Sequence, residues 1–317
     1  MHTQKENQSA DTQILSSLLP CDDGPYIWDR SEHLDGVGST LQWRKQSFIV
    51  THLTHGKWIG NLKNEHHTEE GDQSYYFGLS YPDCDEKSLK AYKHIMPGMF
   101  TNVPKENMLN YIRTTEVNKT TVLVFKWGYM EEEYNYMVFD EAFRKRFHRQ
   151  RALRLTPKRD DDDYWVSLHF RWGDTMNETN DLIIPNGRNG LRLIDYCKCI
   201  AEILSIKPSA KVFVFAEKLE NFYGTCHELD RNKVLHLSDS RSWRRDIDIM
   251  SQSNLLIGGS SSFFMLGAHL CQDCTVIHNS VAKFKKTHYE RKLTSHMNAQ
   301  YCDKNLDCYL KQIRKYL

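Results

Sequence analysis

The sequence predicts an α/β protein of two domains with mostly parallel sheets. Its 317 residues are enough for two domains with separate hydrophobic cores. Through the second half, apolar runs of strand length alternate with helical stretches, which is typical of a parallel sheet covered on both faces. Near the amino terminus a strand, a glycine turn, a helix and another strand follow one another, as in a Rossmann-like unit.

In the first half, residues 1–22 are mostly polar and are expected to form a mobile arm. Strands are expected at 26–28 and 57–60, with a helix through about Leu53 between them. The polar segment 61–87 is expected to be a surface excursion. This half is thus predicted to start as a Rossmann-like domain, 23–155.

A further strand is predicted at 121–125, and a helix from about Val138 carries Phe143 and Phe147 on one face. Eight Lys and Arg residues then lie between positions 144 and 159, followed by four aspartates at 160–163. We interpret them as a solvated helix end and an interdomain linker whose opposite charges attract. The domain boundary is predicted here.

The second half is predicted to contain one parallel sheet, over a domain at 160–285. Ligands of such sheets bind at the carboxyl ends of the strands. The last segment, 286–317, is expected to be helical and to pack back on the first domain. Strands are predicted at 165–169, 211–216, 233–237, 255–257 and 275–278, and helices at 191–204, 244–252 and 262–270.

Composition excludes some functions. Lys plus Arg is 42 against 41 Asp plus Glu, which argues against bulk nucleic-acid binding. The sequence has no run of 18 apolar residues, so no membrane span is predicted, and the amino terminus lacks the layout of a signal peptide.

The cysteines and sequons bear on the compartment. The odd count of nine cysteines leaves at least one unpaired within the chain, while sequons at Asn7, Asn118 and Asn177 fit a lumenal protein. The compartment stays open between the cytosol and a secretory lumen with a targeting segment missing from this sequence.

The hexapeptide His-Phe-Arg-Trp-Gly-Asp, 169–174, ends an apolar run and precedes a polar loop. Side chains at i and i+2 on a strand share a face, so His169 and Arg171 can reach one ligand. The planar guanidinium suits a phosphate, and Gly173 permits a sharp turn. The alternative is a strand that ends in a solvated polar turn.

A second anion site is predicted where the strand at 255–257 leads through a Gly/Ser turn into a helix beginning near Ser262. Backbone N–H groups at such a helix start, with the hydroxyls of Ser260 and Ser261 beside them, bind anions without a charged side chain.

Together these two segments resemble the fucosyltransferase superfamily, which includes the α-1,2-, α-1,6- and protein O-fucosyltransferases. The resemblance is strongest around His-x-Arg-x-Gly-Asp and Ser-Ser-Ser-Phe-Phe, 260–264. It implies a GT-B-like fold and inverting transfer of fucose from GDP-fucose to a glycan or glycoprotein acceptor. It also implies no cofactor, no metal and a Golgi location.

The resemblance assigns donor contacts. His169 corresponds to the guanine contact and Arg171 to the β-phosphate contact, while Trp172 stands where many relatives have a second arginine. The segment 246–254 is similar to one in the α-1,6 enzymes whose first aspartate, here Asp246, holds the guanine edge. A carboxylate can accept two N–H groups of guanine. The other donor-side residues are Gly36, Gly38, Ser260, Ser261, Ser262 and Phe263.

The catalytic base is expected among four acids, ranked Asp35, Glu32, Glu178 and then Asp174, because Asp35 precedes a glycine turn expected to face the interdomain cleft. The 160–163 run contains Asp-x-Asp spacing, but its linker position argues against a metal site. Cys271 and Cys274 are half of a zinc-ribbon spacing, so a disulfide or free thiols are expected there.

The expected partners are a nucleotide sugar, bound by 160–285, and a glycan or glycopeptide acceptor, met mostly by 23–155. Two rival functions remain. One is a glycosyltransferase for another nucleotide sugar, and the other is a catalytically silent relative that binds a nucleotide or a glycan. Nothing in the sequence indicates the acceptor or an oligomeric state.

Overall fold

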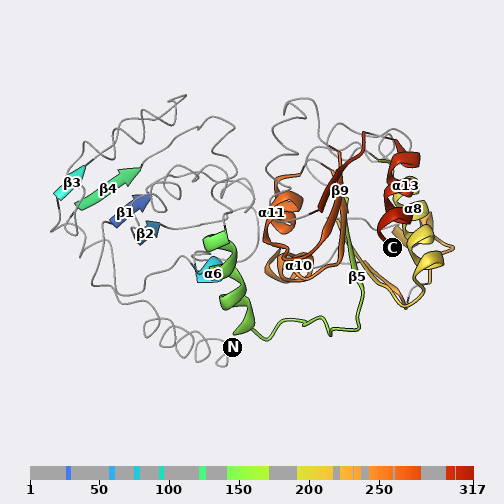
Figure 1. Ribbon diagram of the computed structural model, residues 1–317, viewed down its shortest axis with the longest axis horizontal. Helices are drawn as coiled ribbons and strands as arrows, with labels where there is room; N and C mark the ends of the chain where they lie inside the picture. Colours follow the sequence, from blue (N-terminus) through green and yellow to red (C-terminus); the bar gives the residue numbers. More distant parts are fainter. Residues whose placement is uncertain are drawn as a thin grey trace. The chain divides into compact units, whose positions relative to one another are not determined.

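The computed structural model describes thirteen stretches of the chain, which form two compact units, the first ending at Ala152 and the second beginning at Leu153. Each unit is built on one parallel sheet (Figure 1). The predicted fold class, α/β with mostly parallel sheets, is therefore confirmed. The described residues are 26–29, 57–60, 75–78, 93–95, 121–125, 141–170, 191–216, 222–230, 232–236, 243–259, 261–279, 298–303 and 305–317.

The first unit holds a sheet of order β2-β1-β4-β3. β1 pairs in parallel with both β2 and β4, and β3 pairs in parallel with β4. Parallel neighbours require a crossover, which agrees with the predicted Rossmann-like start. β3 was not predicted. The strands are β1 (Tyr26–Asp29), β2 (Lys57–Gly60), β3 (Lys93–Ile95) and β4 (Thr121–Phe125).

One part of the predicted surface excursion, 61–87, is wrong. The short 3-10 helix η1 (Tyr75–Phe77) buries both Tyr76 and Phe77. They pack on α6 (Glu141–Ala152), where the ring centroids of Phe77 and Phe143 lie 6.0 Å apart and those of Tyr76 and Phe147 5.6 Å. Phe143 and Phe147 do share a helix face, and that face needs an apolar partner, which an aromatic triplet in a polar segment supplies.

The second unit holds a six-stranded sheet of order β10-β9-β8-β5-β6-β7 with every pairing parallel. Each strand and helix predicted between 165 and 278 is present, with ends shifted by at most two residues. The strands are β5 (Trp165–His169), β6 (Lys211–Phe215), β7 (Val234–His236), β8 (Leu255–Gly258), β9 (Thr275–His278) and β10 (Asn298–Tyr301), and the helices are α8 (Leu193–Ile206), α9 (Phe222–Thr225), α10 (Trp243–Met250), α11 (Ser262–Leu270) and α13 (Leu306–Tyr316).

This sheet is covered on both faces, with α8 and α13 on one side and α10 and α11 on the other (Figure 1). Val166 and Leu168 of β5 belong to the core shared with α8 and α13. Ser167 and His169 alternate with them and face the other side, where Ser167 Oγ lies 2.7 Å from Ser253 Oγ. Because both faces are buried, the strands read as nearly continuous apolar runs.

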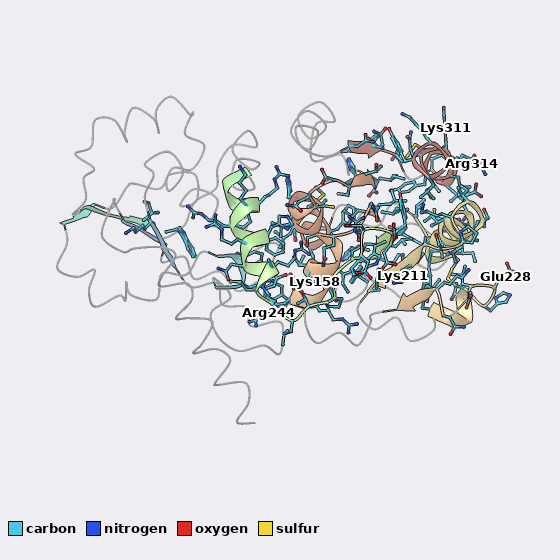
Figure 2. The ribbon with its side chains drawn as sticks, turned by 60° about the horizontal axis from the view of Figure 1, so that its bottom comes forward. Lys158, Lys211, Glu228, Arg244, Lys311 and Arg314 are labelled. Carbon is cyan, nitrogen blue, oxygen red and sulfur yellow. A yellow bond between two sulfur atoms is a disulfide. The ribbon has the colours of Figure 1, made fainter. Side chains whose placement is uncertain are left out.

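The carboxyl-terminal segment differs from its prediction in two ways. Part of it is a strand, β10, which pairs with β9, and its helix α13 packs into the core of the second unit through Tyr309 and Ile313. On the outer side of α13, Arg314 Nε donates to Glu202 Oε1 of α8 at 2.6 Å (Figure 2). β10 is short and polar, so its sequence lacks the apolar pattern that would predict a strand.

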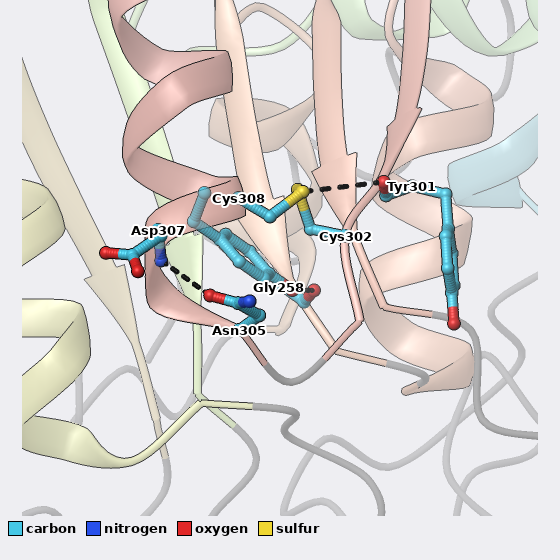
Figure 3. Close-up of a disulfide and its surroundings, with 7 residues drawn as sticks. Gly258, Tyr301, Cys302, Asn305, Asp307 and Cys308 are labelled. Carbon is cyan, nitrogen blue, oxygen red and sulfur yellow. Dashed lines mark hydrogen bonds between the residues drawn. A yellow bond between two sulfur atoms is a disulfide. The ribbon is translucent and has the colours of Figure 1, made fainter.

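Two disulfides lie in the second unit. Cys197–Cys226 joins α8 to the end of α9, and Cys302–Cys308 closes the turn between β10 and α13, where Asn305 Oδ1 also accepts from Asp307 N (Figure 3). Disulfides stabilise more when they close longer loops, so the first, across 29 residues, should contribute more than the second, across 6. Of the two outcomes expected at Cys271 and Cys274, the structure has free thiols, both buried.

The segment after α6 is fastened to the second unit. Arg154 Nη1 donates to Asp248 Oδ1 at 2.7 Å, and Gln252 Nε2 donates to the carbonyl of Pro157 at 2.9 Å. Arg154, from the basic run, is thus paired with α10. At its end, Lys211 Nζ donates to Asp163 Oδ2 at 2.7 Å, and this hydrogen bond lowers the pKa of that carboxyl.

Gly267 of α11 lies against Met250 of α10. A Cβ atom at this position would lie 2.5 Å from Met250 Sδ and 2.9 Å from Met250 Cβ. We predict that Gly267→Ala lowers the free energy of unfolding by about 1–3 kcal/mol, although alanine favours helix by about 1 kcal/mol. Urea denaturation measures this change.

Met250→Ala supplies the control for that prediction, because it removes the sulfur atom that the new Cβ at position 267 would contact. The cost of Gly267→Ala should shrink in the Met250→Ala background. A stabilising effect of Gly267→Ala in the otherwise unchanged protein would contradict the close approach.

Candidate functional site

The carboxyl edge of the second sheet brings four strand ends into line. His169 of β5 is in register with Gly258 of β8, Gly258 with His278 of β9, and His278 with Tyr301 of β10. Register neighbours share a face of a parallel sheet, so both histidines lie on the α10 and α11 side, like Ser167. This edge is where ligands of open α/β sheets bind.

His169 is held at this edge by contacts on both faces. Its ring centroid lies 5.8 Å from that of Phe263 and 6.1 Å from that of Phe264. On the other face, Tyr196 Oη of α8 donates to the His169 carbonyl at 3.4 Å. Burial raises the pKa of Tyr196 far above its ordinary value, so the phenol stays protonated and can donate.

The turn from β8 into α11 depends on Gly258. A Cβ atom there would lie 2.6 Å from Cδ2 of Phe264, whose ring is fully buried. Phe264 therefore packs directly on the strand backbone between the two histidine positions. Of the two phenylalanines at 263 and 264, this one belongs to the core, while Phe263 is partly exposed beside His169.

The first turn of α11 follows β8 at this edge. Its N-cap residue, Ser261, is buried and its side chain makes no capping hydrogen bond within the described part of the chain. The first backbone N–H groups of this helix therefore receive no hydrogen bond from the Ser261 side chain. Ser262, the first residue of the helix, is partly exposed. Such N–H groups and the helix dipole favour a negatively charged ligand.

Asp246 lies in the first turn of α10 and is 8% exposed. α10 links β7 to β8 within one parallel sheet, so it begins at the same carboxyl edge. The neighbouring acid Asp248 has a different task, since it accepts from Arg154. Of the two aspartates on this helix, Asp246 is the one placed in the first turn.

The structure describes only part of the predicted site. It brings His169 next to Phe263 and puts Ser261, Ser262 and Asp246 at the starts of helices on the same side of the sheet. Their predicted binding roles stay predictions. The remaining predicted residues lie outside the described part of the chain: Glu32, Asp35, Gly36, Gly38, Arg171, Asp174, Glu178 and Ser260.

The aspartates at 160–163 are partly accounted for by local structure. Asp163 accepts from Lys211 and, at 3.2 Å, from Trp165 Nε1, and its backbone N–H donates to the Asp160 carbonyl. Among the residues that the structure describes, no cluster of three or more His, Cys, Asp or Glu could hold a metal ion. In the same residues, no helix is long and apolar enough to cross a membrane.

Sequence reasoning missed three residues at this edge. Tyr309 Oη of α13 donates to the Gly258 carbonyl at 3.4 Å, as Tyr196 does to His169. His278 ends β9 in line with Gly258. The end of β9 was predicted correctly, so aligning this strand with β8 would have identified His278. No local sequence pattern identifies the two tyrosines.

No protein-family model and no curated protein matches the sequence. Among solved structures, POFUT1 in complex with GDP is similar with a TM-score of 0.42 and 9% identity, over 78% of this chain and 94% of that chain. The glycosyl transferase family 9 from Veillonella parvula has a TM-score of 0.45 and 11% identity, over 94% and 91%. The fucosyltransferase NodZ from Bradyrhizobium has 0.40 and 11%, over 79% and 93%. Identities this low assign no substrate.

Burial lowers the pKa of His278 to about 4. In the unfolded chain a histidine binds its proton near pH 6.5, so between these values the unfolded state holds more protons than the folded state. We predict that the second unit loses stability as the pH falls from about 6.5 to 4, by up to about 3 kcal/mol from this residue.

Denaturation at several pH values tests this prediction, with His278→Phe as the comparison because it keeps a ring beside Tyr301. The variant should lose less stability over the same range. Parallel curves for the two proteins would show that His278 takes up its proton without cost in the folded state.

Proposed function

We propose that the chain is an inverting glycosyltransferase that transfers fucose from GDP-fucose to a hydroxyl of a glycan or glycoprotein. One observation carries the proposal. The histidine of the His-x-Arg motif and the start of α11 stand at the ends of adjacent strands, β5 and β8, at the carboxyl edge of one parallel sheet. The two motifs that resemble fucosyltransferases, nearly ninety residues apart in sequence, thus belong to one edge.

Guanine recognition is assigned to Asp246 and His169. Guanine offers a ring N–H and an exocyclic N–H side by side, and a carboxylate accepts both. Negative charge is favoured in the first turn of a helix, which supports the assignment of Asp246 in the first turn of α10. Adenine presents an acceptor where guanine has its ring N–H, which would leave the carboxylate unpaired.

The diphosphate is assigned to the first turn of α11, with Ser260, Ser261 and Ser262, and to Arg171. Arg171 follows the last residue of β5 by two positions in the sequence, which supports assigning it to the same ligand as His169. Phe263 would provide an apolar wall to the pocket. We further propose Gly36 and Gly38 as donor-binding residues.

In the proposed reaction the acceptor hydroxyl oxygen attacks the anomeric carbon of fucose while the bond from that carbon to the diphosphate oxygen breaks. The bonding electrons leave with GDP, the acceptor proton passes to a carboxylate, and the configuration inverts. Arg171 and the N–H groups of α11 stabilise the charge that develops on the diphosphate. For the carboxylate we propose Asp35 first, then Glu32, then Glu178, and we propose that no metal takes part.

The two disulfides of the second unit favour an oxidising compartment. This supports a location in the secretory lumen, where glycoprotein and glycan acceptors are available.

Nucleotide selectivity tests the proposal directly. A ligand at one hundred times its dissociation constant stabilises a protein by about 2.7 kcal/mol. GDP and GDP-fucose should therefore raise the melting temperature, in EDTA as in manganese, whereas UDP and NAD should not. Equal shifts with UDP and GDP, or a shift that requires manganese, would contradict the proposal.

The same experiment should include Asp246→Asn. The asparagine amide has one oxygen that can accept, but its N–H₂ group would face a guanine N–H, and two donors cannot hydrogen-bond to each other. The variant should weaken GDP binding at least about tenfold. The matched control is Asp195→Asn, since Asp195 is likewise a buried acid in a first helix turn, that of α8, and its carboxylate accepts from Arg192 at 2.7 Å. That control should change stability and leave GDP binding unaltered.

Arg171 is predicted to act on the transition state. Arg171→Ala should cost about 2–4 kcal/mol of transition-state stabilisation, and Arg171→Lys should recover only part, because a point charge cannot replace the planar fork. Turnover with an identified acceptor measures both variants, with Arg192→Ala as a control that removes only the pair with Asp195. Unchanged turnover in Arg171→Ala would mean that this side chain merely ends a strand.

A further inference from the structure

Asn279 stands one residue beyond β9 at the carboxyl edge of the second sheet. The last residue of β9, His278, is in register with Gly258, from which the chain enters the turn to α11. Asn279 is therefore close in the fold to the edge assigned to the donor, although none of the motifs contains it. It is 2% exposed.

Within the described part of the chain, neither Nδ2 nor Oδ1 of Asn279 has a hydrogen-bond partner. Two other asparagines of the same unit are engaged. Asn254 Oδ1 accepts from Trp165 N at 2.9 Å, and Asn305 Oδ1 accepts from Asp307 N at 2.9 Å. Buried polar groups are nearly always hydrogen-bonded, and leaving one unpaired costs free energy. Among the described residues, the unpaired amide of Asn279 is therefore a candidate to bind a ligand.

We propose that Asn279 is a donor-binding residue whose side-chain amide hydrogen-bonds to a sugar hydroxyl of the nucleotide sugar. This inference rests on the proposed function. It adds a third strand, β9, to the donor site, beside β5 and β8.

The chemistry of the amide selects the hydroxyl. An amide has one N–H₂ donor group and one carbonyl acceptor, and a hydroxyl both donates and accepts. A phosphate would accept from Nδ2 but leave Oδ1 unpaired next to a negative charge. A hydroxyl, or two neighbouring hydroxyls of a sugar ring, engages both atoms. The ribose and the transferred sugar both offer such groups.

The test compares Asn279→Leu with the unchanged protein. Leucine fills a similar volume and removes both polar atoms, so the variant should unfold at the same temperature or higher while binding GDP-fucose at least about tenfold more weakly. Calorimetric titration and thermal unfolding measure the two properties. If leucine prevents folding, Asn279→Ala, which adds no bulk, answers the same question.

Asn254→Leu is the matched control, because Asn254 is hydrogen-bonded and lies before β8, at the opposite edge of the sheet. It should lower the unfolding temperature and leave the affinity for GDP-fucose unchanged. The pair of variants therefore separates a ligand contact from a structural amide by opposite effects.

GDP alone distinguishes the two hydroxyl sources. A loss of affinity for both GDP and GDP-fucose in Asn279→Leu assigns the ribose, and a loss for GDP-fucose only assigns the transferred sugar. Unchanged affinity for both ligands overturns the role of Asn279 while leaving the proposed function intact. If the unchanged protein binds neither ligand, the proposed function itself fails.

Discussion

The parallel pairing of β5 with β8 is the constraint on which the second unit depends. It joins residues that are nearly ninety positions apart, and polar contacts at the amino edge hold its register. Asn254 Oδ1 accepts from the backbone N–H of Trp165, and Ser167 and Ser253 share a hydrogen bond. A slip by one residue would turn every side chain of β5 to the opposite face. His169 would then point into the core of α8 and α13 instead of toward α11.

From this register the edge is built on both faces of the sheet. On the α11 side, the ring of Phe264 occupies the space that a side chain at position 258 would need, so helix and strand meet without a gap. On the other side, two buried phenols hold the carbonyls of His169 and Gly258. Since a neutral phenol donates to a carbonyl without introducing charge, the two tyrosines hold the strand ends without adding charge to this edge of the sheet.

Most of the second sheet could be predicted from the sequence because its predicted strands are largely apolar runs of three to five residues separated by helices of clear period. β3, η1 and β10 have three or four residues each and lack that signal, so the predictions there were absent or wrong. The same limit applies to the site. His169, Asp246 and the serine turn belong to local motifs. Tyr196, Tyr309 and Asn279 matter only because of which strand lies beside which, and this long-range information is not contained in any short segment.

The hydrogen bond from Tyr309 to the Gly258 carbonyl spans 51 positions of sequence and connects α13 to the turn before α11. Cys308, the residue before Tyr309, is covalently tied to Cys302, so the tyrosine is presented by a short closed loop (Figure 3). A substitution in α13 can therefore move the backbone at the end of β8 without altering either motif.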